Sequence, residues 1–307
     1  MLRLGLCCLF KESPIHFRST TATYVKKMER PAQLERLSQL CLANAYSLVA
    51  AVEEVHRLGI GAFRVSSPLF PLYTHPEIGY QIEDLADQEE IRKALNSVKV
   101  LKETYHLRLS FHPDQFTLLS SPRPEVTSAA LRDLEYQAVL ANMIGADTIN
   151  IHGGGVYGDK SSALSRLEKE ISALPEPIRS RLTLENDDVS YTVKDLLPVC
   201  EKLSIPLVYD VHHHRCNPDG LSIAAATEAC IKTWQSVGRE AYFHISSPRE
   251  GWHGKPKPHA DYIDLADFPS EWLKHTATID VEAKAKELAV VKLRQDLGLP
   301  KWQSSER

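Results

Sequence analysis

The chain has 307 residues, of which 43% are hydrophobic and 25% charged, and its formal net charge is −4. This length suits one barrel or two smaller domains, and the composition excludes a disordered or fibrous protein. The negative charge argues against binding of nucleic acid through bulk charge, but it leaves room for a local basic groove.

The cysteines and the N-terminus bear on location. Six cysteines occur without a Cys-x-x-Cys pair, and Cys7 and Cys8 are adjacent. This spacing argues against a disulfide framework or a zinc knuckle, so we expect free thiols and a cytoplasmic protein. The apolar N-terminus is short and carries Arg3, which favours a first strand over a signal peptide. No apolar run reaches the roughly 18 residues of a membrane span.

Eight short apolar runs, rich in β-branched residues, predict buried strands. They cover residues 2–8, 61–66, 107–112, 147–152, 181–186, 206–211, 240–245 and 276–282. Helical patterns lie between them at 31–59, 88–105, 124–145, 161–173, 192–203, 221–237 and 283–297. Alternating strands and helices are typical of a parallel sheet. The sequence therefore predicts the α/β class, with one (β/α)8 TIM barrel over residues 1–307 and a core at roughly 2–297.

Six successive strands end in a side chain that can bind a metal ion. These residues are His112, His152, Glu185, Asp210, His244 and Glu282. Because the strands of such a barrel all end at one face, we expect these side chains to converge there. A lone strand-end His is usually a hydrogen-bonded rim residue, whereas six such ends in succession favour a metal site. Imidazole and carboxylate ligands suit Zn²⁺, Mn²⁺ or Fe²⁺ better than Ca²⁺.

Further candidate ligands follow the sixth strand. Successive side chains diverge, so His213 is expected to face the site with Asp210, while its two neighbours are supporting, phosphate-facing or exposed. His259 and Asp261 form a His-x-Asp pair on a long loop and could complete a third ion site with His213. Two or three ions about 3.5–4 Å apart, bridged by carboxylates, would stabilise the attacking and leaving oxygens of phosphate-ester cleavage.

Two long loops, residues 9–30 and 246–274, combine basic and aromatic side chains. The second carries Arg249, Lys255 and Lys257 around Trp252. This mixture suits a phosphate backbone and unstacked bases, although two solvated loops would have the same composition. Gln115 and Phe116 follow the third strand, where they could fill the hole left by a displaced base. Taken alone, the pair is better explained by a solvated Gln and a Phe that packs under the loop.

The run His152-Gly-Gly-Gly has a rival interpretation as the oxyanion-hole motif of lipase-type hydrolases. That interpretation requires a Gly-x-Ser-x-Gly nucleophile elbow, which the sequence lacks. The glycines are better explained as backbone that passes close to a metal or a phosphate.

These motifs together resemble the UV damage endonuclease family over roughly residues 2–297. They are RLGLCC, FRVSSPLFP, FHPDQF, NIHGGGVYGDK, LEND, YDVHHHRCNP, HISSP and DVEAKAKELA, in that order. The resemblance implies a TIM barrel related to endonuclease IV. It also implies an enzyme that nicks double-stranded DNA immediately 5′ to cyclobutane dimers and 6-4 photoproducts, initiating excision repair. Two or three divalent ions, Mn²⁺ first and Zn²⁺ as the alternative, are the implied cofactors, without any nucleotide, and a monomer is expected.

The resemblance also assigns residues. It groups the ligands as His112, His152 and Glu185 for the first ion, as Glu185, Asp210, His244 and Glu282 for the second, and as His213, His259 and Asp261 for the third. It implies catalytic roles for Glu185, Glu282 and His244, and a further His near the site at His75. Gln115 and Phe116 match a pair that probes the duplex opposite the lesion, and Arg249, Lys255 and Lys257 are expected at the DNA.

Three positions depart from the family pattern. Phe116 replaces a more usual Tyr, Leu6 stands where a Tyr commonly follows the Gly, and Tyr242 stands where some members carry a Lys near the metals. Two other functions remain open. One is a metal-dependent sugar isomerase or epimerase, which uses the same fold and ligand types. The other is a DNA-damage binding protein that keeps the metals for stability.

Overall fold

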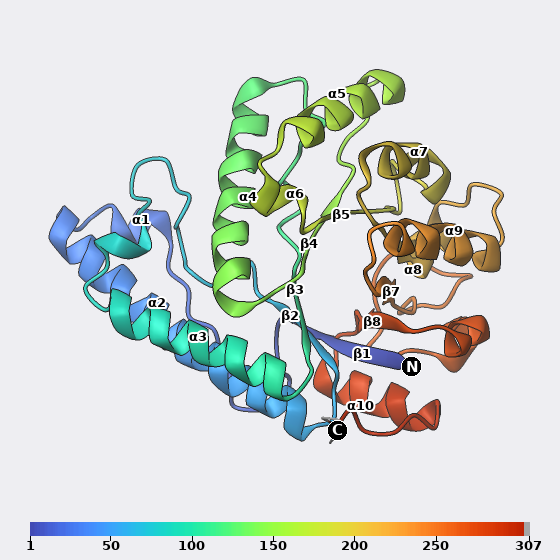
Figure 1. Ribbon diagram of the computed structural model, residues 1–307, viewed down its shortest axis with the longest axis horizontal. Coiled ribbons are helices and arrows are strands. Elements are labelled where there is room, and N and C mark those ends of the chain that lie inside the picture. The colour runs from blue at the N-terminus through green and yellow to red at the C-terminus, as the bar shows by residue number, and fades with distance from the viewer. Residues whose placement is uncertain (304–307) are drawn as a thin grey trace.

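The computed structural model describes residues 1–303, and its centre is a closed barrel of eight parallel strands (Figure 1). Each strand pairs with the next, and β1 closes the barrel by pairing with β8. The strands are β1 Leu2–Cys7, β2 Ala62–Val65, β3 Arg108–Phe111, β4 Thr148–His152, β5 Leu182–Glu185, β6 Leu207–Asp210, β7 Ala241–Ile245 and β8 Ala277–Val281. The prediction of a (β/α)8 TIM barrel is confirmed, and every strand lies within one or two residues of its expected range.

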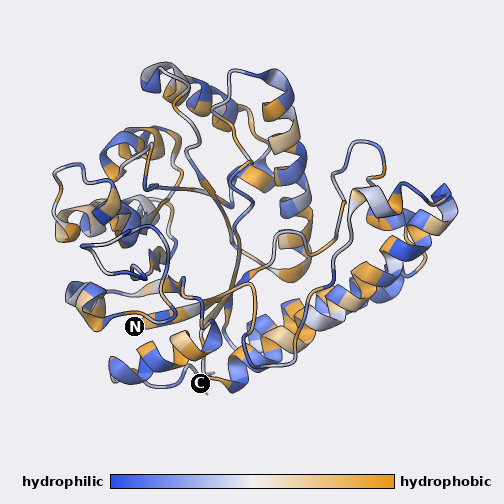
Figure 2. Ribbon diagram, turned by 180° about the vertical axis from the view of Figure 1, so that it is seen from behind, coloured by the Kyte–Doolittle hydropathy of each residue, from blue (hydrophilic) through white to orange (hydrophobic). Residues whose placement is uncertain are grey.

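Helices surround the barrel. The α-helices are α1 Ala22–Val25, α2 Arg30–Arg57, α3 Gln88–Thr104, α4 Pro124–Ile144, α5 Lys160–Ala173, α6 Glu176–Arg179, α7 Val193–Leu203, α8 Val211–Cys216, α9 Ile223–Gln235 and α10 Glu287–Asp296. Short 3₁₀ turns lie at Ile82–Asp84, Leu265–Asp267 and Ser270–Lys274. Figure 2 shows apolar and polar residues alternating along α2 and α3, which lie side by side. Their apolar faces therefore meet each other and the barrel.

Local signals explain where several helices begin and end. Pro124 opens α4, and Gly145 ends it in the left-handed conformation at a φ of 73°. Thr192 and Asp195 form a capping box that starts α7. The last helix begins at Glu287 instead of the expected residue 283. The preceding residues bond instead to the long loop, with the Lys284 amide donating to the Ala260 carbonyl at 3.0 Å.

Helix α8 was not expected, because residues 211–216 were interpreted as a loop. Asp210 ends β6 and also caps α8, since its side chain accepts from the His213 amide at 2.8 Å. An Asp directly before a helical run is a recognised start signal, so the sequence did contain this information.

The strand register places the predicted ligands as neighbours. His152 lies opposite Glu185 on β4 and β5, and Asp210 lies opposite His244 on β6 and β7. The strand residues are buried almost throughout, as expected for a parallel sheet covered by helices. The barrel therefore holds these side chains on a rigid base at the carboxyl ends of its strands.

Candidate metal centre

Glu185 is the centre of the cluster at the carboxyl ends of the strands. Its side chain is 1% exposed, and its two oxygens face different neighbours. His112 Nε2 lies 3.0 Å from Oε2, and His244 Nδ1 lies 3.0 Å from Oε1. The Asn150 amide donates to Oε2 at 2.5 Å and is held in turn by Thr183. Asn150 was missed by the sequence reasoning, although a polar residue inside a buried strand is a signal of a required partner.

Two groups of three ligand atoms share this carboxylate. One is formed by His112, His152 and Glu185, and the other by Glu185, Asp210 and His213, with the ligand atoms of each group within 4.8 Å of one another. The first group is the one that the family resemblance implies for one ion. In the second, Asp210 is joined by His213, which the resemblance assigned to a different ion.

The hydrogen bonding of His112 fits a bound cation. Its Nδ1 lies 3.1 Å from the carbonyl oxygen of Pro113, so this nitrogen carries the ring hydrogen and donates it. Burial lowers the pKa of His112, which keeps the ring neutral. The lone pair of Nε2 then faces the Glu185 carboxylate at 3.0 Å. Two electron-pair donors facing each other at this distance are stabilised by a divalent ion that both of them bind.

Helix α8 orients the second group. The His213 Nδ1 lies 2.9 Å from the Asn186 carbonyl oxygen, 3.4 Å from Glu185 Oε1 and 3.6 Å from Asp210 Oδ2. Asn186 also exchanges two hydrogen bonds with the backbone of Asp210. The Asp210 Oδ2 atom is buried and has no hydrogen-bond partner among residues 1–303. A buried carboxylate oxygen in this state is the kind of atom that a metal ion satisfies.

The other two histidines of the triplet have different roles. His214 is buried, with Nδ1 at 2.6 Å from the Tyr209 hydroxyl and Nε2 at 3.3 Å from Asp219. It therefore anchors α8 to the barrel. His212 is buried with its ring centre 5.1 Å from that of Trp252 and 5.3 Å from that of His259. It connects the cluster to the loop of residues 246–274.

Glu282 and His259 lie at the edge of the cluster. Glu282 Oε1 is 3.5 Å from His244 Nδ1, and Oε2 is 3.9 Å from His259 Nδ1. A short antiparallel bridge between Pro248 and His259 holds the loop in place. Asp261, expected beside His259, has an exposed side chain, and its backbone carbonyl accepts from the Ala285 amide. The structure thus brings His259 to the edge of the cluster, and the role of Asp261 stays a prediction.

A buried arginine beneath the cluster was missed by the sequence reasoning. Arg64 on β2 contacts Glu282, His244 and Asp280 with three different nitrogens. A charged residue inside a buried strand demands a partner, so the run Phe63-Arg64-Val65 did carry a signal. Tyr242, one of the departures from the family pattern, is buried and donates to Asp280 at 2.9 Å.

The charges of the cluster balance one another. Burial alone would raise the pKa of Glu185, but the imidazoles of His244 and His152 outweigh it and hold that pKa well below its usual value. Burial would lower the pKa of His213, and the carboxylates of Asp210 and Glu185 raise it well above its usual value instead. Glu185 is therefore ionised at neutral pH, and a metal ion would compete with a proton on His213.

The predicted DNA-probing pair lies at the opening of this site. Phe116 is 73% exposed, and Gln115 is exposed beside it. Both line a cavity of about 470 Å³ that also reaches His152, His213, Gly154 and Asp188. The packed alternative for Phe116 is wrong. Leu6, at the other departure, is fully buried in the core and is not part of this surface.

The remaining predicted residues are placed as follows. Lys257 pairs with Asp188 of the cavity at 3.0 Å, Arg249 pairs with its neighbour Glu250, and Lys255 is exposed. His75 accepts the amide hydrogens of Glu77 and Ile78 through Nδ1, which ties it to its own loop. Those contacts do not join His75 to the cluster.

The three glycines after His152 pack closely. A Cβ on Gly153 would lie 2.7 Å from the ring of Tyr191, and one on Gly154 would lie 2.5 Å from Ser120 Oγ. Gly154 also has a φ of +88°, in the left-handed region. The glycines therefore allow close approach of the backbone beside the cavity.

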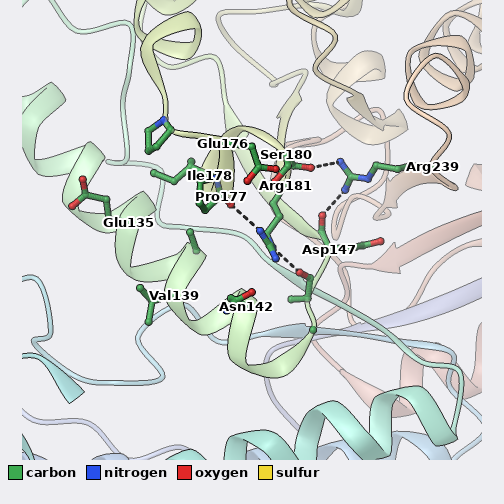
Figure 3. Close-up of a pocket in the computed structure, with 14 residues that line it drawn as sticks. Glu135, Val139, Asn142, Asp147, Glu176, Pro177, Ile178, Ser180, Arg181 and Arg239 are labelled. Atoms are coloured by element: carbon green, nitrogen blue, oxygen red, sulfur yellow. Dashed lines mark hydrogen bonds between the residues drawn. The ribbon is translucent and has the colours of Figure 1, made fainter. Parts of the chain in front are cut away.

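A larger cavity, of about 870 Å³, lies away from this cluster (Figure 3). It is formed between α4 and α6, beside residues that precede β4, β5 and β7. Its arginines bond to backbone: Arg181 donates to the Pro177 carbonyl at 2.9 Å, and Arg239 to the Asp147 carbonyl at 2.6 Å. The candidate metal ligands lie at the opposite ends of the strands.

No helix within residues 1–303 is long and apolar enough to cross a membrane.

Comparisons with solved structures support the fold. The chain is similar to a crystal structure named SacUVDE, with a TM-score of 0.84, 26% identity and coverage of 98% of this chain and 100% of that one. Endonuclease IV from Thermus thermophilus matches with a TM-score of 0.61 and 14% identity, and the match covers 96% of this chain and 98% of that one. An L-ribulose 3-epimerase matches with a TM-score of 0.55 and 14% identity, and the match covers 100% of this chain and 89% of the epimerase. These last two likenesses show the fold alone.

Sequence comparison identifies the family. The model of UV-endonuclease UvdE matches residues 2–304. The UV DNA damage endonuclease of Bacillus velezensis is 36% identical over 302 residues, covering 94% of this chain and 91% of the relative. The UV DNA damage endonuclease of Bacillus mycoides is 35% identical over 286 residues, which cover 90% of this chain and 87% of the relative. The resemblance seen in the motifs is confirmed: the chain belongs to the UV-endonuclease UvdE family.

Proposed function

We propose that this single-domain enzyme hydrolyses the phosphodiester bond immediately 5′ to UV photoproducts in double-stranded DNA and depends on two or three divalent ions. The main support is the pair of ligand groups that share Glu185, next to a cavity that Phe116 and Gln115 border. All the proposed ligands come from one chain, so we propose that a monomer is sufficient for activity.

We assign the ligands from the chemistry of the residues present. His112 and His152 would hold one ion with Glu185, and Asp210 and His213 a second one with the same carboxylate. His244, Glu282 and His259 extend the set, and His75 and Asp261 are candidates only through the family resemblance. Imidazole with carboxylate favours Mn²⁺ or Zn²⁺. When bound, such ions supply the charge that neutralises the scissile phosphate and the acidity that generates a hydroxide nucleophile.

The protein's own residues supply the positioning. Glu185 is ionised and fixed from both sides, so it holds two ligand groups at a constant separation. Glu282 lies at the rim, where we propose that it orients the attacking water. Phe116 would stack in the gap left by the displaced lesion, and Gln115 would bond to the bases opposite it. Arg249, Lys255 and Lys257 would hold the phosphate backbone.

The test is a plasmid-nicking assay with purified protein and Mn²⁺. Nicking that appears only after UV irradiation of the plasmid is expected, with the cut mapped to the 5′ side of the lesion on a defined oligonucleotide. Retarded but uncut DNA would indicate a binding protein, and turnover of a ketose sugar would indicate an epimerase. Neither result is compatible with the proposal.

The matched variant is Glu185→Gln, which keeps the shape of the side chain and removes its charge. Nicking is expected to fall by more than about 100-fold, beyond the 10- to 100-fold loss that removal of an outer hydrogen-bond partner causes. The circular dichroism spectrum should be unchanged, because the amide fits the same space. Full activity of this variant would contradict the central role of Glu185.

A further inference from the structure

Arg64 lies inside the barrel, directly beneath the ligand cluster. It is 8% exposed, and each of its three nitrogens has a different partner. Nε donates to Asp280 Oδ2 at 2.8 Å, Nη1 lies 2.7 Å from Glu282 Oε1, and Nη2 lies 2.9 Å from His244 Nε2. A planar guanidinium can make these three contacts at once because its donors are fixed in a fork.

Asp280 on β8 balances the charge of Arg64 and fixes its orientation. Both oxygens of this fully buried carboxylate are used, since Oδ2 accepts from Arg64 and Oδ1 accepts from the Tyr242 hydroxyl at 2.9 Å. Tyr242 also lies 3.0 Å from Ser110 Oγ. The space for the carboxylate comes from Gly5, where a Cβ would lie only 2.2 Å from Asp280 Oδ1. Gly5 therefore leaves the room that the Asp280 carboxylate needs, and Arg64 and Tyr242 each donate a hydrogen bond to one of its oxygens.

The contacts of Arg64 determine how two predicted ligands face the site. Because a guanidinium only donates, His244 Nε2 is the acceptor, and Nδ1 is turned to Glu185 Oε1 at 3.0 Å. Glu282 is held by Oε1, which leaves Oε2 turned toward His259. Without this fork, His244 would keep its contact with Glu185, and Glu282 would keep only its longer contacts with His244 and His259.

We propose that Arg64 and Asp280 are positioning residues. Arg64 makes His244 donate from Nδ1 to the shared carboxylate of Glu185 and fixes the direction of Glu282, which supports metal binding and phosphodiester cleavage without contact to the DNA. This inference rests on the proposed function. It also gives Tyr242 a role, since its hydroxyl donates to Asp280 at 2.9 Å and holds that carboxylate in position.

The experiment compares Arg64→Lys with Arg294→Lys. Both arginines are buried, but Arg294 on α10 donates to the backbone carbonyls of Leu58 and Gly59, which precede β2 at the end of the barrel away from the cluster. A Lys keeps the charge in both cases, and at position 64 it replaces three directed contacts by one ammonium group. Mn²⁺ affinity is measured by calorimetry, nicking of a UV-lesion oligonucleotide gives kcat and KM, and thermal unfolding reports on the fold.

Arg64→Lys is expected to weaken Mn²⁺ binding and to lower kcat, each by about 10- to 100-fold, with KM for DNA unchanged. Arg294→Lys should lower the melting temperature while Mn²⁺ affinity and kcat stay at the wild-type level. An Arg64→Lys protein that is less stable but keeps wild-type Mn²⁺ affinity and kcat would overturn the inference, because its role would then be structural only.

Tyr242→Phe provides a second, milder test if Arg64→Lys does not fold. It removes one of the hydrogen bonds to Asp280, so a loss of Mn²⁺ affinity in the same direction and smaller than about 10-fold supports the inference, and unchanged affinity overturns it. The metal titrations need no DNA. If the wild-type protein binds Mn²⁺ but leaves irradiated DNA intact, the proposed function fails, while the titrations still decide the role of Arg64.

Discussion

At the scale of single residues, the cluster combines side chains that protons and metal ions both bind. His213 is the clearest case, because the carboxylates of Asp210 and Glu185 raise its pKa. A raised pKa means that this His stabilises the metal-free fold fully below about pH 6.5, the usual value for an unfolded chain. That contribution is lost as the pH rises through the raised value in the folded protein.

The stabilisation by Mn²⁺ is therefore expected to depend on pH. A metal ion needs the neutral ring, so it must displace the proton at low pH and meets less competition as the pH rises. The increase in melting temperature on adding Mn²⁺ should be larger at about pH 8 than at about pH 6, when each is compared with an EDTA-treated sample. A shift that is constant or falls with pH would contradict this description of the cluster.

Phe116 allows recognition to be separated from stability. Its ring is 73% exposed, so Phe116→Ala should change the free energy of unfolding by less than about 0.5 kcal/mol. Loss of a stacking contact should weaken binding to lesion-containing DNA by about 1–3 kcal/mol. Gel-shift titration measures this loss. Val100→Ala, at an exposed position on α3, should leave both quantities unchanged, and equal effects of the two variants would exclude a stacking role.

At the scale of elements, helix starts contribute to stability apart from the chemistry. Thr192 accepts from the Asp195 amide, and the Asp195 carboxylate accepts from the Thr192 amide at 3.0 Å. Thr192→Ala should lower the free energy of unfolding by about 0.5–2 kcal/mol in a urea titration, with nicking activity unchanged. Ser172→Ala, in the exposed last turn of α5, should have no such effect. Equal stability of the two variants would show that the capping box contributes nothing.

The elements also show what sequence reasoning can reach. The strands were located because apolar runs with polar ends are local features, and the six strand-end ligands followed from the geometry of parallel strands. Helix α8 was missed although Asp210 is a standard cap, because residues 210–214 were considered for their side-chain chemistry and not as the start of a helix. The role of Arg64 could not be derived, since its partner Asp280 lies 216 residues further along the chain. A pairing over that distance is set by the closure of the barrel and leaves no local pattern.

At the scale of the whole molecule, a net charge of −4 must be reconciled with a DNA substrate. We expect DNA binding to depend on a few basic side chains near the site. Each of them should then contribute a large part of the salt dependence of the DNA-binding constant. Lys255→Ala is expected to weaken binding to all sequences alike and to reduce the slope of log K against log salt by about 1. Lys232→Ala, on the last turn of α9, serves as the control and should leave the slope unchanged.

The pairing of β1 with β8 has a consequence for synthesis of the protein. One edge of β1 pairs with β2, but the other edge pairs only with residues 277–281, so this edge stays open until almost all of the chain has been made. An unpaired strand edge attracts other chains. Glu282 follows β8 directly, so the last candidate ligand is made together with the strand that closes the barrel. A polypeptide released early from the ribosome would thus be prone to aggregation and would lack Glu282 from the proposed metal centre.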